Sequence, residues 1–399
     1  MKKEFREFFR GKNNLILISI LLLSMFLRST AFFLPHKSFD ELVYQTLAKK
    51  TYYDPLDYTL RGTGFLNSRF LVLGHEMPVP PYYDEPLFHI PPLFVYMISL
   101  SYRLFGIEIP SAALVPFLFG SITCLVVYLI ASKLFDKKVA ILASFFSAIS
   151  PIHWVASSKI WNDVVMAFFI ALTFYFFYWG IERGNSKFII LAGLFEGLAL
   201  LTKQAAILVF PALLLYGVII EASSKGAFIE RMSIFILISL LIFSPWLFWV
   251  TSIYKVPWYL PEISKEVLQS NPWFILVTNR PWYYFLISLP LTVPFYLFSY
   301  MGIVKLRREK PFILLVLWFL SFLIFFTLYP SGEVRFLIGA LPALDILASA
   351  YIVDKLENLR GYERTMILTF LGIAIIASLY VGAHKIYYNA DLLGVLYWI

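Results

Sequence analysis

Two pairs of neighbouring acids lie in a stretch that is otherwise rich in tyrosine and proline. Asp40 and Glu41 follow Ser38, and Asp84 and Glu85 follow two tyrosines. A carboxylate fixed at a helix start could take a proton from a hydroxyl or an amine. The structural interpretation is a capping box between Ser38 and Glu41, with Asp40 facing the helix dipole. Both interpretations are compatible, because a capped helix start holds an acid rigidly.

His89 lies four residues beyond the second acid pair. Together, Asp40, Asp84, Glu85 and His89 could supply the three or four ligands that a metal ion needs, although no fixed ligand spacing supports such a site. The alternative is that the acids are solvated and that His89 lies among lipid headgroups. A divalent metal is therefore possible, but no cofactor is required.

Several cations lie at the ends of apolar runs that would share one membrane face. Lys159 precedes Asp163 by four residues, Lys203 interrupts a long apolar stretch, and Arg335 opens another. Each cation alone is explained more simply by snorkelling or by topology, and Asp163 could be only a helix-start acid. Together they suit a phosphate-bearing lipid headgroup, which Arg can bind bidentately and Lys as a point charge.

The elements that must position these residues are membrane helices. Of the 399 residues, 60% are hydrophobic and 15% are charged, and cysteine occurs once. This composition excludes a disordered chain, a disulfide scaffold and a cysteine-rich metal cluster. Long apolar runs predict eleven spans, near 14–34, 112–131, 139–157, 164–181, 188–202, 204–220, 233–253, 282–303, 311–329, 336–353 and 366–383.

The positions of Lys and Arg predict the orientation. With the N-terminus in the cytoplasm, the inside segments hold more than half of the 33 Lys and Arg; these segments are 1–13, 132–138, 182–187, 221–232, 304–310 and 354–364. The net charge of +8 is then a mark of topology and needs no nucleic-acid partner. Keeping the later loops positive inside requires the run 92–105 to be an interfacial helix and Lys203 to separate two spans. The acid pairs then lie in a long outer loop, 35–110.

In this order, the motifs resemble those of the GT-C membrane glycosyltransferases, in the branch of dolichyl-phosphate-mannose protein mannosyltransferases and lipid A aminoarabinose transferases, whose relatives are often labelled RgtA/B/C/D-like. The matching segments are Phe39–Tyr44, His89–Leu93, Leu104–Gly106, Lys133–Lys138, Ser150–Asp163, Gly197–Lys203 and Arg335–Leu344. Each motif is weak alone, and their order and topology make the match specific.

The resemblance implies an all-α GT-C-like bundle over 1–383, with a short extracytoplasmic tail at 384–399. It implies transfer of a hexose or pentose, with inversion, from a polyprenyl-phosphate donor to a protein, lipid or envelope glycan on the outer face of the plasma membrane. In that reaction Asp40 is the base and Glu41 supports it. The donor phosphate would be bound by His89, Lys203 and Arg335, and the cavity would be lined by Asp84, Glu85, Lys159 and Asp163.

Two other functions fit parts of the sequence. A lipid-linked sugar flippase or other transporter would explain the intramembrane charges but not the long outer loop with acid pairs at both ends. A non-catalytic subunit of an envelope-assembly complex is the third function considered. Glu196, Arg28 and Asp345 lie within predicted spans, where pairing between helices is the expected role. Nucleotide-binding glycine motifs and a Gly-x-Ser-x-Gly elbow are absent from the sequence.

Overall fold

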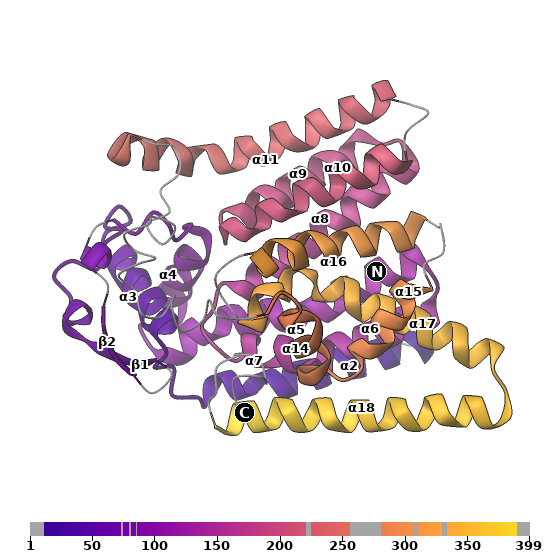
Figure 1. The fold of residues 1–399 in the computed structure, drawn as a ribbon. Helices are drawn as coiled ribbons and strands as arrows, with labels where there is room; N and C mark the ends of the chain where they lie inside the picture. Colours follow the sequence, from indigo (N-terminus) through magenta and orange to yellow (C-terminus); the bar gives the residue numbers. More distant parts are fainter. Residues whose placement is uncertain are drawn as a thin grey trace, which may run out of the picture.

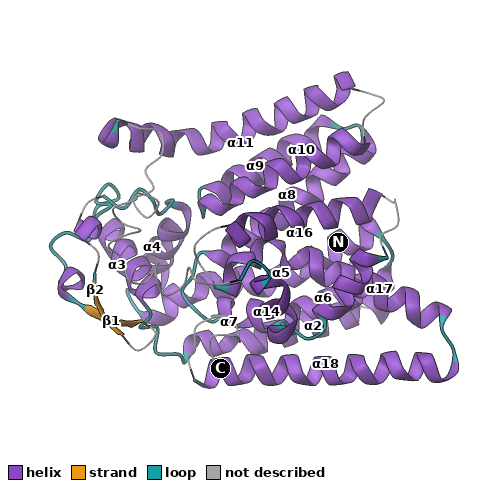
Figure 2. Ribbon diagram, in the orientation of Figure 1, coloured by secondary structure: helices purple, strands orange, loops and turns teal. Residues whose placement is uncertain are grey.

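The computed structural model describes residues 12–72, 75–79, 81–84, 86–220, 225–255, 281–305, 310–328 and 333–388. Within these ranges the chain is nearly all helical, as predicted, with one small two-stranded sheet (Figure 2). The apolar runs form α2 (Lys12–Arg28), α5 (Ile109–Leu134), α6 (Lys137–Ile149), α7 (Pro151–Ser157), α8 (Asp163–Arg183), α9 (Ser186–Leu200), α10 (Val209–Ile220), α11 (Lys225–Tyr254), α14 (Tyr284–Thr292), α15 (Tyr296–Val304), α16 (Lys310–Leu328), α17 (Leu341–Asn358) and α18 (Gly361–Tyr387).

The segment between α2 and α5 forms a separate cap at one end of the bundle, on the left of Figure 1. It contains η1 (Ser29–Phe32), α3 (Phe39–Tyr53), η2 (Gly64–Asn67), β1 (Arg69–Val72), β2 (His75–Pro78), η3 (Pro81–Asp84) and α4 (Leu93–Phe105). The two strands pair antiparallel, with Arg69 opposite Pro78. The short helix predicted at 92–105 is therefore present as α4, and it packs against α3.

The described parts of the predicted inside segments gather at the opposite end of the bundle, where α17 ends and α18 begins (Figure 1). Lys133 and Arg183 both lie over the ring of Trp179. Lys138 contacts Glu357 at 2.6 Å and so joins two more of these segments. The charge pattern of the sequence thus corresponds to a real clustering of basic turns on one face.

The predicted number of eleven spans is not confirmed. Seven described helices are long and apolar enough to cross a membrane, or eight if α6 and α7, which meet at a bend of 53°, form one span. Pro151 lies at this bend, and proline has no N–H for the helical ladder. The run 282–303 divides into two nine-residue helices, α14 and α15, and the runs around Lys203 form shorter helices.

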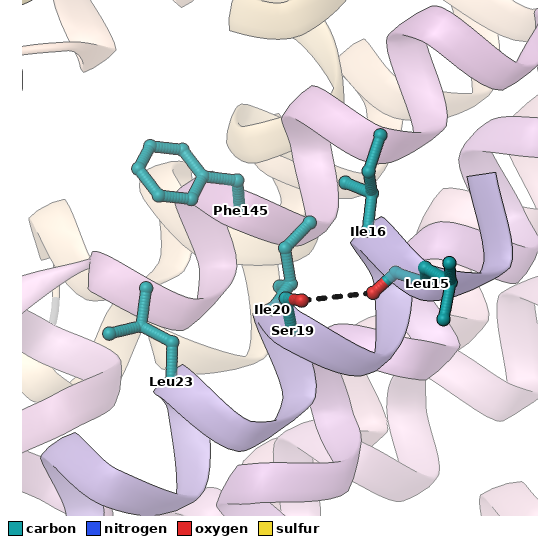
Figure 3. A pocket seen from close by; sticks show the side chains of 6 residues that line it. All are labelled: Leu15, Ile16, Ser19, Ile20, Leu23 and Phe145. Atoms are coloured by element: carbon teal, nitrogen blue, oxygen red, sulfur yellow. Dashed lines mark hydrogen bonds between the residues drawn. The ribbon is translucent and has the colours of Figure 1, made fainter. Parts of the chain in front are cut away.

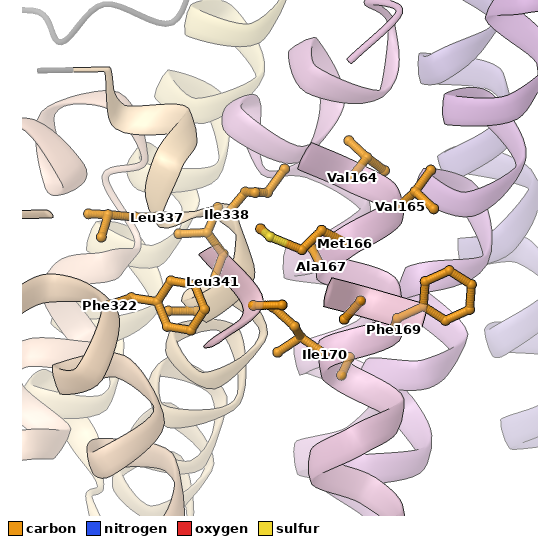
Figure 4. Packing of buried hydrophobic residues seen from close by; sticks show 14 of the residues in the cluster. Val164, Val165, Met166, Ala167, Phe169, Ile170, Phe322, Leu337, Ile338 and Leu341 are labelled. Carbon is orange, nitrogen blue, oxygen red and sulfur yellow. The ribbon is translucent and has the colours of Figure 1, made fainter. Parts of the chain in front are cut away.

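The turn η4 (Gln204–Leu208) follows α9, and α8 packs closely on η6 (Val334–Ala340). Figure 4 shows Met166 and Ile170 of α8 facing Ile338 of η6 and Phe322 of α16. The carbonyl of Gly339 accepts a hydrogen bond from the indole of Trp318 at 2.8 Å. This packing fixes the position of η6, the turn that carries Arg335.

The three intramembrane charges are buried, and two of them pair between helices as predicted. Arg28 donates to Ser157 Oγ (3.2 Å) and to the carbonyl of Ala148 (2.9 Å), which ties α2 to the bend between α6 and α7. Asp345 accepts from the hydroxyl of Tyr296 at 3.1 Å. Glu196 is fully buried on α9 and lies beside Thr173 of α8.

A shallow apolar groove lies between α2 and α6, far from the charged residues of the cap (Figure 3). Its lining is almost entirely aliphatic and aromatic, and the hydroxyl of Ser19 is satisfied by the carbonyl of Leu15 on its own helix at 3.0 Å. Such a lining suits lipid chains and offers no group that could perform chemistry.

We expect Gly197→Ala to lower the thermal unfolding midpoint. A Cβ at Gly197 would lie 2.5 Å from Ile242 Cβ and 3.0 Å from the carbonyl oxygen of Ser239, so α9 and α11 would have to separate. Overpacking of this kind costs about 1–3 kcal/mol. Gly372→Ala is the matched control, because nothing lies within 4 Å of its Cβ position. Equal midpoints for the two variants in detergent would contradict the close packing of α9 on α11.

Candidate functional site

Five charged side chains meet where the cap joins the bundle. Asp40 comes from α3, Asp163 from the start of α8, and Lys203 from the break between α9 and η4; Glu333 and Arg335 come from the turn that precedes α17. They are linked by ion pairs that cross between these elements. The sequence prediction of acids and cations on one face is thus realised as a single cluster.

Glu41 fixes the start of α3. Its carboxylate accepts from the backbone N–H (3.1 Å) and hydroxyl (2.8 Å) of Ser38, which completes the predicted capping box. The other oxygen accepts from His36 Nδ1 (2.6 Å) and from the backbone N–H of Ile160 (3.0 Å). Because Ile160 belongs to the loop before α8, this one carboxylate joins the cap to the bundle.

The electrostatics of Glu41 follow from these contacts. Burial alone would raise its pKa, but the hydrogen bond from His36 and the charge of Lys159 outweigh burial and lower the pKa to about 2. His36 places its second ring nitrogen 2.6 Å from the carbonyl oxygen of Ala31. The ring of His36 thus bridges the Glu41 carboxylate and the backbone at the end of η1.

Asp40 has a different environment from its neighbour. Its side chain is 36% exposed, and its Oδ2 lies 2.6 Å from Arg335 Nη2. Successive residues of a helix point about 100° apart, so Glu41 faces the interior while Asp40 faces the cluster. The carboxylate of Asp40 also contributes to raising the pKa of buried Tyr44, after the larger effect of burial. Asp40 therefore combines a fixed position with access from outside.

Arg335 is the centre of the cluster. Its Nε lies 2.5 Å from one oxygen of Glu333, and its Nη2 donates to the other at 3.3 Å. The guanidinium stacks on the ring of Trp161, with its carbon 4.1 Å from the ring centroid. The side chain is 8% exposed. A buried guanidinium is tolerated because two carboxylates and an aromatic face surround it.

Lys203 forms the second ion pair of the site. Its Nζ lies 2.7 Å from Asp163 Oδ1 and 4.8 Å from the centre of the Phe336 ring. The lysine side chain is 23% exposed, whereas Asp163 is buried. The amide of Asn162 donates to the carbonyl of Thr202 at 3.0 Å, so the two loops are also joined through the backbone. Lys203 thus presents a cation beside Arg335, anchored by Asp163.

Lys159 is buried rather than exposed at a helix end. It is 1% exposed, and its charge helps to lower the pKa of Glu41. Its Nζ lies 6.0 Å from the ring centre of Trp161. Lys159 therefore belongs to the supporting layer beneath the cluster.

The acids and histidine at the end of the outer loop are placed differently. Asp84 is largely exposed and pairs with Arg61 at 3.3 Å, as the solvated alternative predicts. Glu85 lies outside the described residues. His89 packs edge-on against Tyr83, which packs against Phe39. Among the described residues, no group of three or more His, Cys, Asp or Glu side chains could hold a metal ion. Because Glu85 is outside these residues, the possible metal set stays a prediction.

Three residues of the site carry no strong sequence signal. His36 precedes Glu41 by five residues, Trp161 lies midway between Lys159 and Asp163, and Glu333 precedes Arg335 by two. Only proximity to predicted residues could have indicated them. Their roles come from contacts with distant segments.

A known protein family matches a part of the chain that contains some of the site residues. A sequence model of the family described as dolichyl-phosphate-mannose-protein mannosyltransferase matches residues 89–249. This range includes Lys159, Asp163 and Lys203 but neither Asp40 nor Arg335. Two uncharacterized proteins of Aquifex aeolicus (strain VF5) are similar. One is 24% identical over 79% of this chain and 63% of its own length, and the other is 23% identical over 74% and 67%.

Solved structures share the fold. ArnT from Cupriavidus metallidurans, bound to undecaprenyl phosphate, superposes with a TM-score of 0.66 at 18% identity, over 91% of this chain and 63% of that one. The apo oligosaccharyltransferase of Archaeoglobus fulgidus gives 0.66 at 17% identity, over 96% and 57%. The same organism's AglB, in complex with an inhibitory peptide and a dolichol-phosphate, gives 0.64 at 15%, over 96% and 57%.

These comparisons confirm the predicted resemblance. The chain has the fold of GT-C membrane glycosyltransferases, with several apolar helices long enough to span a membrane. It spans 63% of the length of the first Aquifex relative and of ArnT.

We expect acid to destabilise the protein partly through Glu41. The folded-state pKa is about 2, below the ordinary 4.5, so the stabilisation is complete above about pH 4.5 and is lost as the pH falls toward 2. Glu41→Gln should therefore unfold at a lower temperature at neutral pH and lose less stability between these pH values than the wild type. Glu357→Gln is the control, because Glu357 forms an exposed ion pair with Lys138 at the end of the bundle opposite the cap. Parallel pH curves for wild type and Glu41→Gln would refute this role.

Proposed function

We propose that this protein is a membrane glycosyltransferase that moves a sugar from a polyprenyl-phosphate donor to an acceptor. The observation that carries the proposal is Asp40, a partly exposed carboxylate held 2.6 Å from buried Arg335. Arg335 and Lys203 both contact the ring of Phe336. The fold shared with ArnT and with AglB, whose structures contain undecaprenyl phosphate and dolichol-phosphate, supports the donor class.

The proposed reaction is a single displacement. Asp40 takes the proton from the acceptor's hydroxyl or amine as that atom attacks the anomeric carbon of the sugar. The bond between this carbon and the phosphate oxygen breaks, and polyprenyl phosphate leaves with the electron pair. One displacement inverts the anomeric configuration. The contribution of the protein is positioning, a base and cations for the developing charge.

Arg335 and Lys203 are the proposed partners of the donor phosphate. Arg335 can form a planar, two-point contact with a phosphate, and Lys203 adds a compact charge. Asp40 occupies one side of Arg335. A phosphate bound to Arg335 would supply negative charge in its place, so that donor binding itself would release Asp40 to act as the base.

The remaining predicted residues have supporting roles in this proposal. Glu41 and Lys159 hold the layer beneath Asp40, and Asp163 anchors Lys203. His89 lies behind Tyr83 and Phe39, where it can set the position of the α3 start.

We place the reaction on the extracytoplasmic face of the plasma membrane, with the N-terminus in the cytoplasm. The basic turns gather at the end of the bundle opposite the cap and the site. Positively charged loops remain in the cytoplasm, so the opposite end faces outward. The acceptor is a protein, a lipid or an envelope glycan.

We expect Asp40→Asn to lower kcat by about 10²-fold or more, because an amide cannot accept the acceptor's proton. The measurement is release of polyprenyl phosphate from a panel of polyprenyl-phosphate sugars by the purified protein. Asp57→Asn is the matched control, since Asp57 is in the same loop and also has a cation partner at 2.6 Å, Lys50. Full activity of Asp40→Asn would refute the base assignment. Translocation of the donor without a glycosidic product would refute the proposed function.

We expect Arg335→Lys to raise the KM for the donor by at least about tenfold, because lysine lacks the planar fork and the stacked face of the guanidinium. The matched control is Arg61→Lys, at an exposed pair in the cap. Donor KM and kcat are to be measured together. A KM equal to that of the wild type would show that Arg335 does not bind the donor.

A further inference from the structure

We propose that the indole N–H of Trp161 donates a hydrogen bond to the phosphate of the lipid donor, beside Arg335; this inference rests on the proposed function. Trp161 is not among the residues that the sequence motifs single out. Its indole stacks on the guanidinium of Arg335. Each of these two groups has a buried N–H donor for which the described residues provide no acceptor.

The first donor is on Trp161. The side chain is 1% exposed, and Nε1 is buried without a hydrogen-bond partner among the described residues. An unsatisfied buried donor costs about 1–3 kcal/mol. Other buried indoles show the usual solution: Trp318 donates to the carbonyl of Gly339 at 2.8 Å. Trp161 lacks such an acceptor among the described residues and, unlike Trp179, it lies within the charged cluster, so the acceptor in this proposal is a ligand.

The second donor is on Arg335. Glu333 and Asp40 occupy Nε and Nη2, so two of the three guanidinium nitrogens already face carboxylates. Nη1 is buried and has no hydrogen-bond partner in the described part of the chain. The remaining edge of this guanidinium is thus the edge at which a further anion would bind.

The two donors belong to one structural unit. The guanidinium carbon lies 4.1 Å from the centre of the Trp161 ring, so the two planes are in contact. Lys203 lies on the other side of Phe336, whose ring centre is 5.4 Å from the same guanidinium carbon. A ligand that satisfies both donors needs several acceptor oxygens and negative charge. A phosphate monoester or diester has both, whereas a sugar hydroxyl has no charge to balance the cations.

Trp161 therefore has two separable functions. Its ring supports the guanidinium of Arg335, and its N–H contacts the ligand. Phenylalanine keeps a smaller aromatic face and removes the N–H donor, so Trp161→Phe tests the second function when the loss of ring size is controlled. Trp179→Phe is the matched control: Trp179 also carries a buried Nε1 without a partner among the described residues and also lies under an arginine, but it is at the opposite end of α8.

The test measures the affinity of wild type, Trp161→Phe and Trp179→Phe for undecaprenyl phosphate and for inorganic phosphate. We expect Trp161→Phe to bind both probes roughly tenfold more weakly, because the indole contacts the group that they share, and Trp179→Phe to match the wild type. Unchanged affinity of Trp161→Phe for both probes would overturn the inference. A loss confined to undecaprenyl phosphate would also overturn it, since the ring would then contact the lipid chain. A wild type that binds neither probe would instead overturn the proposed function.

A second measurement does not depend on how well the variant folds. In wild-type protein with ¹⁵N-labelled indoles, addition of undecaprenyl phosphate should shift one of the ten tryptophan N–H signals downfield, as expected for a new charge-assisted hydrogen bond. That signal should be missing from the spectrum of Trp161→Phe. If no indole signal shifts at a saturating concentration of the lipid, the inference is wrong.

Discussion

The ion pair between Asp40 and Arg335 is the constraint on which the rest of the site depends. It joins residues that are 295 positions apart, one in the cap and one in the turn before α17. A buried guanidinium costs several kcal/mol unless charge and hydrogen bonds compensate it. Here Glu333 and the ring of Trp161 complete the compensation. The cap and the bundle are thus held together by the same charges that would act on a substrate.

The site forms where membrane helices are interrupted. The α6–α7 bend leads into the loop with Lys159, the break after α9 carries Lys203, and η6 carries Arg335. Irregular backbone at membrane depth is tolerated only where protein or an internal cavity covers it. Within the described part of the chain, these interruptions leave seven or eight helices long enough to span a membrane, and they coincide with the charged residues of the proposed site. In the sequence, prolines and charges within apolar runs mark both the helix interruptions and the charged residues of the site.

The sequence predicts the local motifs of the site better than the contacts between distant segments. Ser38 and Glu41 are three residues apart, so their capping box is a local property and was predictable. The charge pattern and the predicted topology also place Lys203 and Arg335 at the end of the bundle opposite the basic turns. By contrast, the contact of Glu41 with Ile160 spans 119 residues, and no periodicity encodes it. For Asp84 the sequence left two interpretations open, and the structure agrees with the solvated one, because Asp84 pairs with Arg61 near solvent.

Asp40 and Glu41 show how one short motif can divide two tasks. The inward acid accepts four hydrogen bonds from three residues and keeps its charge down to about pH 2, so it can hold the helix start but offers no free oxygen to a substrate. The outward acid has one cationic partner and remains accessible. In the proposed reaction, a phosphate ligand at Arg335 would replace Asp40 as the anion beside the guanidinium, so donor binding would be coupled to the release of Asp40. The ion pair between Asp40 and Arg335, which joins the cap to the bundle, would then disfavour proton transfer to Asp40 before the donor is bound.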